Sequence, residues 1–118
     1  MTTVVGTASV HTTAAACDYL DDADGVVVVT ATGEGTTPRD AGDAGNVART
    51  RLPGATVETV RRAGEPAAVV KAVASEHDAD RVVVGTRQGD PERAGEPPGS
   101  TVQALLAAAE RPVVVIPV

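Results

Sequence analysis

Large aromatic side chains are almost absent from this chain. Its 118 residues contain no Phe, no Trp and a single Tyr. The core must therefore be built from Val, Ala and Leu, and the aromatic platforms on which single-stranded nucleic acids stack are missing. The formal net charge of −6 also argues against a nucleic-acid partner, because binding a phosphate backbone requires a basic surface.

Cysteine and lysine are scarce as well. Cys17 is the only cysteine, so the sequence predicts no internal disulfide and no cysteine-based metal site. Lys71 is the only lysine among ten basic residues. An acidic chain with little lysine and small apolar side chains is typical of a salt-adapted protein, although a GC-rich genome favours the same residue types.

Long apolar runs are missing, so no segment is expected to span a bilayer. The N-terminus lacks the basic region and apolar core of a signal peptide. We therefore expect one cytoplasmic domain over residues 1–118, with no membrane contact.

Short β-branched runs alternate with segments of helical character along the whole chain. Strands are expected over residues 3–7, 26–32, 55–61, 82–84 and 113–116. The unbroken valine runs are typical of parallel strands that are buried on both faces. The strand at 55–61 has polar residues on both sides and is expected at a sheet edge. The pattern predicts an α/β fold with a five-stranded, parallel, doubly wound sheet.

Helices are expected between these strands. Residues 10–20 predict a helix with Val10, Ala14, Cys17 and Leu20 facing inward. A third helix should begin at Pro66, and its buried face comprises Ala67, Val69, Val70, Val73 and Ala74. Residues 36–54 predict only a short helix that begins at Pro38, because two glycines each weaken it by ~1 kcal/mol. These glycines are Gly42 and Gly45.

The segment from residue 82 to residue 101 carries the strongest functional signal. Gly85 and Gly89 follow a buried strand, and Ser100 then opens a helix with Gln103 at the capping-box spacing. That helix has one apolar stripe, formed by Val102, Leu105, Leu106 and Ala109. A strand, a glycine loop and a capped helix can together bind an anion, because the first turn of a helix offers free N–H groups.

These residues resemble the C-terminal half of the universal stress protein family. The resemblance rests on Val84-Gly85-Thr86-Arg87, on the nine residues between Gly89 and Gly99-Ser100, and on the run 111–116. Nucleotide-binding members have two residues between the first two glycines, whereas three separate Gly85 from Gly89 here. The chain is identified as a short member, of haloarchaeal type by its composition. The resemblance implies a Rossmann-like sheet, as in adenine nucleotide alpha hydrolases, with strand order 3-2-1-4-5.

The resemblance also implies a stress-response protein that binds ATP or another adenine nucleotide, with Mg²⁺ as an optional companion of the phosphates. The residues that fall on the family's phosphate-side positions are Gly85, Gly89, Gly99, Ser100 and Thr101. Thr30 and Ala31 fall where backbone meets adenine, and Thr7 falls where the family carries an Asp that contacts the nucleoside. Ligands of doubly wound sheets bind beyond the strand ends where the strand order reverses, which agrees with this placement.

Two alternatives remain open. One is a dimeric interaction module that binds no nucleotide, and pairing through the C-terminal strand 113–116 would make either kind of protein a homodimer. A dedicated enzyme is the weaker alternative, with at most slow ATP hydrolysis and no assigned catalytic residue. No P-loop occurs, and His11 and His77 are interpreted as surface residues without a partner. Arg87 and Arg93 share their loop with three acidic residues and are interpreted as solvated charges.

Overall fold

Strands and helices alternate along the part of the chain that the computed structural model describes. The described residues are 2–6, 10–20, 24–32, 38–85, 100–108 and 110–116. The elements in chain order are β1 (Thr2–Gly6), α1 (Val10–Tyr19), β2 (Gly25–Thr32), α2 (Pro38–Arg51), β3 (Thr56–Ala63), α3 (Pro66–Glu76), β4 (Arg81–Gly85), α4 (Ser100–Ala107) and β5 (Val113–Ile116).

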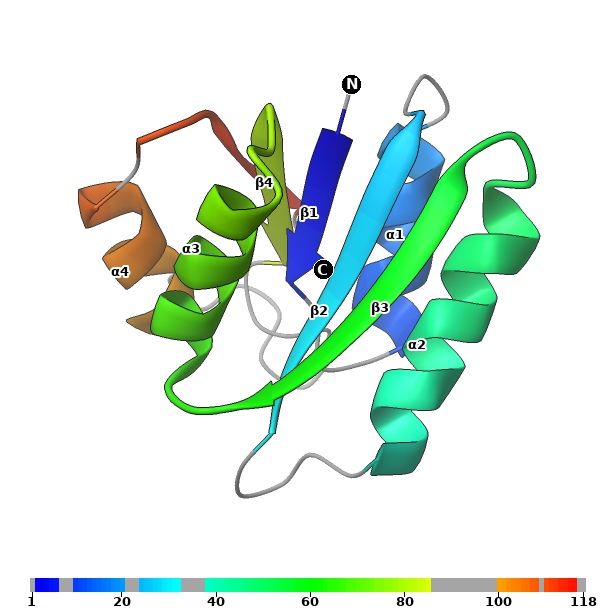
Figure 1. Ribbon diagram of the computed structural model, residues 1–118, viewed down its shortest axis with the longest axis horizontal. Helices are drawn as coiled ribbons and strands as arrows, with labels where there is room; N and C mark the ends of the chain where they lie inside the picture. Colours follow the sequence, from blue (N-terminus) through cyan, green and yellow to red (C-terminus); the bar gives the residue numbers. More distant parts are fainter. Residues whose placement is uncertain are drawn as a thin grey trace.

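The strands form one sheet in the order β3-β2-β1-β4-β5, and every neighbouring pair is parallel. The predicted fold class, the strand order and the edge position of β3 are therefore confirmed. Figure 1 shows α3 and α4 on one side of the sheet and α1 and α2 on the other. The molecule thus has three layers, with the sheet in the middle.

Two hydrophobic layers hold the helices on the sheet. Val82 and Val84 face α3 and α4, whereas Val83 faces α1 and α2, so β4 is buried on both faces as its valine run predicts. The predicted inner face of α3 is also confirmed, since its five apolar members are all buried. Within the described residues, no helix combines the length and apolar character that crossing a membrane requires.

The second helix departs from the expectation of a short element. It begins at Pro38 as predicted but extends for 14 residues, through both glycines. Its residues Ala44 and Ala48 are buried, as is Leu52 directly after its end, and all three pack on the sheet beside β2 and β3. Tertiary burial therefore outweighs the low helical propensity of the sequence.

The inner faces of two other helices also differ in detail. Thr13, Ala16 and Cys17 of α1 are buried, as is Leu20 directly after the helix, whereas the expected Ala14 is only half-buried. In α4, Val102 and Leu105 are buried, but Leu106 is 53% exposed. Val102 and Leu105 belong to the hydrophobic layer shared with α3 and β4, whereas Leu106 lies outside it. The expected positions Val10 and Ala109 are not among the described side chains.

Side chains and backbone close both ends of α3. The Glu65 carboxylate accepts hydrogen bonds from the backbone N–H groups of Ala67 and Ala68, at 3.2 and 3.0 Å. At the other end, Asp78 has a φ of 48°, and the Ala79 N–H donates to the Ala74 carbonyl at 2.9 Å. This arrangement is a Schellman motif in which Asp occupies the left-handed position that glycine usually takes. The sequence analysis identified Pro66 but neither of these caps.

Candidate functional site

The centre of the sheet is the point at which the strand order reverses. From β1 the chain continues to β2 on one side, whereas from β4 it continues to β5 on the other side. The pairing of β1 with β4 ends at Gly6 and Val84, so Gly85 extends one residue beyond this pair. In open α/β sheets, ligands bind outside the carboxyl ends of the strands at this point.

The last residues of β2, 30–32, extend beyond its described pairing with β1. β1 pairs with β2 only as far as Gly6 and Val29, whereas β3 pairs with β2 as far as Thr32. Among the described strands, none pairs with the β1-facing side of residues 30–32. Backbone N–H and C=O groups on that side can therefore serve a ligand, because each backbone polar group requires a hydrogen-bonding partner.

The structure brings part of the predicted site to the carboxyl ends of the central strands. Thr30 is buried and Ala31 half-buried at the end of β2, and Gly85 is buried at the end of β4. Ser100 and Thr101 form the first turn of α4, as expected. Their side chains are outside the described set, so the predicted Ser100 cap stays a prediction. Thr7, Gly89 and Gly99 lie outside the described residues, as do Arg87 and Arg93.

Gly6 is a constraint that the sequence analysis did not identify. A Cβ atom added at Gly6 would lie 2.9 Å from Cγ2 of Val70 and 3.2 Å from Cγ1 of Val84. Both valines belong to the layer beneath α3 and α4. Glycine therefore permits α3 to pack directly on the end of β1, beside the candidate site. The only signal in the sequence was the glycine itself.

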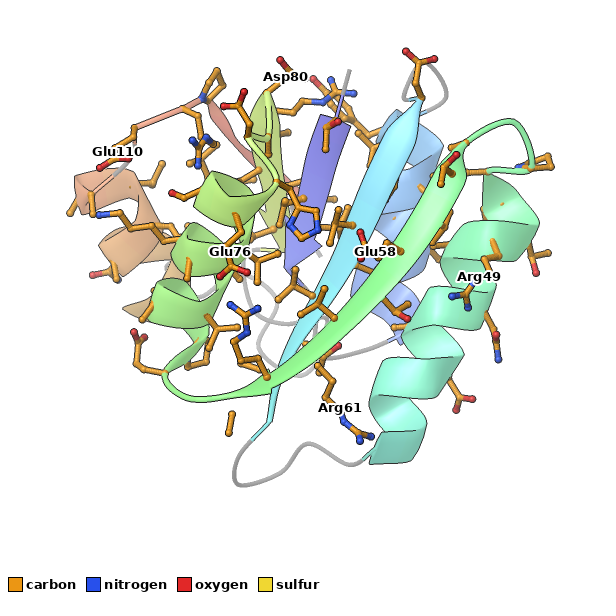
Figure 2. The ribbon with its side chains drawn as sticks, in the orientation of Figure 1. Arg49, Glu58, Arg61, Glu76, Asp80 and Glu110 are labelled. Atoms are coloured by element: carbon orange, nitrogen blue, oxygen red, sulfur yellow. The ribbon has the colours of Figure 1, made fainter. Side chains whose placement is uncertain are left out.

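A network of charged residues links β3 to α3, away from the strand ends. Arg62 donates two hydrogen bonds to the Glu76 carboxylate, at 2.6 and 3.0 Å. His77 Nε2 lies 3.0 Å from Glu58 Oε2, and His77 Nδ1 lies 3.0 Å from the Val73 carbonyl oxygen. Figure 2 labels Glu58 on β3 and Glu76 on α3. The interpretation of His77 as a residue without a partner is therefore wrong, because Glu58 approaches it from 19 positions earlier in the chain.

The contacts of His77 suit an imidazolium ion. The Val73 carbonyl and the Glu58 carboxylate can only accept hydrogen bonds, so both ring nitrogens must carry a proton to donate to them. The backbone acceptor raises the pKa of His77 above its ordinary value of 6.5, partial burial opposes the rise, and Glu58 and Glu76 add to it. The pKa of Glu76 is lowered, chiefly by the hydrogen bonds from Arg62.

We expect the His77 contacts to make stability depend on pH near neutrality. Because the folded-state pKa is raised, their contribution is complete below pH 6.5 and is lost as the pH rises through the folded-state pKa. The expected loss is below about 1 kcal/mol, since Glu58 is solvent-exposed and screened. Urea unfolding from pH 5.5 to 8.5 measures it, and His77→Gln should flatten that part of the profile. An identical pH profile in the variant would contradict the assignment.

The described residues offer little other reactive chemistry. They contain no group of three His, Cys, Asp or Glu side chains that could hold a metal ion. Cys17 is buried, and its burial raises the pKa of the thiol, which keeps it in the unreactive protonated form. The described parts of the site are thus backbone groups, the glycines Gly6 and Gly85, and small side chains at the carboxyl ends of parallel strands. The order of the five parallel strands places the chain in the doubly wound class of α/β domains.

Comparison with known proteins agrees with this class. The model of the universal stress protein family matches residues 8–117. The chain belongs to the universal stress protein family. No curated protein sequence matches it. Nothing in these comparisons supports a haloarchaeal origin, so salt adaptation stays a hypothesis based on composition.

Several solved structures share the fold at low sequence identity. A universal stress protein in complex with cAMP has a TM-score of 0.74 and 21% identity, with 98% of this chain and 95% of that chain covered. A universal stress protein from Archaeoglobus fulgidus has a TM-score of 0.71 and 24% identity, with 98% of each chain covered. The same organism's protein in complex with dAMP has a TM-score of 0.68 and 23% identity, with 98% and 97% covered.

Proposed function

We propose that this chain is a nucleotide-binding universal stress protein, which takes ATP or AMP at the reversal point of its sheet. The observation that carries the proposal is the projecting end of β2, whose residues 30–32 present backbone groups that β1 does not pair. Adenine is a planar base with donors and acceptors on its edge, so an unpaired strand edge suits it. Structures of family members in complex with cAMP and dAMP support this choice of ligand.

The remaining parts of the nucleotide are assigned to the other predicted residues. In this proposal Gly85, Gly89, Gly99, Ser100 and Thr101 surround the phosphates, and the first turn of α4 supplies N–H donors to them. Thr7 takes the position at the nucleoside. The protein then acts in stress response as a switch whose state depends on the bound nucleotide, with Mg²⁺ as an optional companion of the phosphates.

Titration of ATP into ¹⁵N-labelled protein tests this placement. The proposal requires the largest amide shifts at Thr30, Ala31, Gly85 and the first turn of α4. AMP and GTP, titrated separately, separate the contribution of the base from that of the phosphates. Saturable shifts confined to other parts of the sheet, or no shifts with millimolar ATP, would reject the site.

Thr7→Asp should tighten ATP binding by about fivefold, because a carboxylate can accept a charge-assisted hydrogen bond from a ribose hydroxyl. Such a bond is worth roughly 1.5–3 kcal/mol against about 1 for a neutral one. Calorimetric titration measures the affinity. Thr56→Asp is the matched control. Thr56 is exposed at the amino-terminal end of β3, so it lies away from the carboxyl ends of the strands where the site is proposed. Equal affinities in the wild type and the Thr7 variant would show that the nucleoside lies elsewhere.

A nucleotide-free interaction module is the second candidate, and the position of β5 favours it. Val113–Ile116 forms the edge strand of the sheet, and all four residues are only half-buried. No described strand covers its outer side. Unpaired apolar edges associate readily, and a two-fold mate would supply identical hydrogen bonds.

We therefore expect light scattering at micromolar concentration to give twice the 11.8 kDa mass of one chain. A dimer without any ATP-induced shift would favour the interaction module over the nucleotide-binding protein. A monomer mass across that concentration range would contradict pairing through β5.

A further inference from the structure

A groove of about 210 Å³ runs between α3 and α4, on the face of the sheet that these helices cover. Among the described residues, twelve line it and eight of these are Ala, Val or Leu, so this lining is largely apolar. Val82, Leu105 and Val113 contribute the larger apolar side chains. Thr30, Ala31 and Gly85, the candidate nucleotide residues whose surroundings the structure describes, do not line it.

The charged residues that line the groove differ in their hydrogen bonds and ion pairs. The Glu65 carboxylate caps α3 through two backbone N–H groups. Lys71 and Glu110 face each other across the groove, with Nζ and Oε1 3.8 Å apart; Figure 2 labels Glu110 at the α4 end. Arg111 is half-buried and has no hydrogen-bond or ion-pair partner among the described residues. Its guanidinium is thus a cation at the lining of an apolar groove, without an acceptor in the part of the chain that the structure describes.

The size of the groove limits its occupant. An apolar protein cavity of about 150 Å³ accommodates benzene. At about 210 Å³ this groove has room for one ring or a short chain with one small polar group. A half-buried guanidinium pairs best with a planar anion, because its N–H groups match the two oxygens of a carboxylate.

We propose that the groove between α3 and α4 binds a small apolar carboxylate, such as an aromatic or short-chain acid. Its apolar part lies on Val82, Leu105 and Val113, and its carboxylate pairs with Arg111. Lys71 also lines the groove, and its charge is shared with Glu110. This inference does not depend on nucleotide binding, because among the described residues the two sites have none in common.

Benzoate is a suitable probe, with benzyl alcohol and benzylamine as neutral and cationic analogues of similar shape. Amide shifts in ¹⁵N-labelled protein should centre on Ala67, Ala104 and Ala108, with millimolar affinity for benzoate. Benzoate should bind about tenfold more tightly than benzyl alcohol, and Arg111→Gln should remove that preference. Added ATP should leave benzoate binding unchanged.

Two alanines of α4 supply a matched pair of blocking variants. Ala104 lines the groove, whereas Ala107 is exposed on the same helix and does not line it. Ala104→Leu should fill the groove and abolish the benzoate shifts, and Ala107→Leu should leave them intact. The proposal is overturned if benzoate causes no saturable shift at 20 mM, if both leucine variants bind alike, or if benzyl alcohol binds as tightly as benzoate.

Discussion

Gly6→Ala is expected to destabilise the protein by about 1–3 kcal/mol, the usual effect of overpacking a well-filled core. The added methyl group would lie 2.9 Å from Val70 Cγ2 and 3.2 Å from Val84 Cγ1. Both valines are only 4% exposed, so neither can move outward into solvent. Urea unfolding with a constant m-value measures the change.

Two variants separate steric overlap from a general intolerance of alanine. Gly25 is also a strand glycine, but an added Cβ there would meet only Thr2 Oγ1, at an ordinary 3.6 Å. Gly25→Ala should therefore be close to neutral or slightly stabilising. Val70→Ala removes the methyl groups that Gly6→Ala would strike, so the double variant should lose less stability than the sum of the two single changes. Strict additivity would show that the overlap with Val70 is not the cause.

Two glycines of one helix should respond in opposite directions to the same substitution. Gly42→Ala should stabilise the protein by up to ~1 kcal/mol, because alanine has the higher helical propensity. No atom lies within 4 Å of a Cβ added there. Gly45→Ala should instead destabilise it by about 1–3 kcal/mol. Gly45 is buried, and a Cβ at that position would overlap Cγ2 of Thr59 on β3.

The contrast between these glycines can be checked by changing Thr59. In a Thr59→Ala background, Gly45→Ala should lose most of its penalty, while the effect of Gly42→Ala should be unchanged. Thermal and urea unfolding give both quantities. Stabilisation by Gly45→Ala in the native background would mean that α2 does not approach β3 as closely as the structure shows.

The fold was predictable because its strongest signals are local. The valine runs at 26–29 and 82–84 identify strands buried on two faces without knowledge of their neighbours, and both lie inside the sheet. The length of α2 was not predictable in this way. Glycine at position 45 lowers the helical propensity of α2. It is nevertheless required there, because any Cβ would overlap Thr59, which is 14 positions later and on β3. Propensity alone does not contain that contact.

The site was predictable only in part, and for a similar reason. Gly85 was predicted because it directly follows a buried valine run, and Thr30 and Ala31 were predicted because they end another. Gly6, by contrast, matters because Val70 packs on it, and His77 matters because Glu58 and Val73 accept from it. These relations join residues that are far apart in sequence, so composition and spacing did not identify them. The position of Arg111 in the groove likewise becomes visible only when α3, α4 and β5 are placed together.

The central position of β1 has a consequence for biosynthesis. As the chain emerges from the ribosome, β1, β2 and β3 can pair with one another and pack against α1 and α2 before β4 has been synthesised. Until residues 81–85 appear, one side of β1 is an open edge, and the face later covered by α3 and α4 exposes Val4, Val27 and Val29. A chain arrested near residue 65 should therefore be prone to aggregation, and chaperones should bind it in preference to the finished protein.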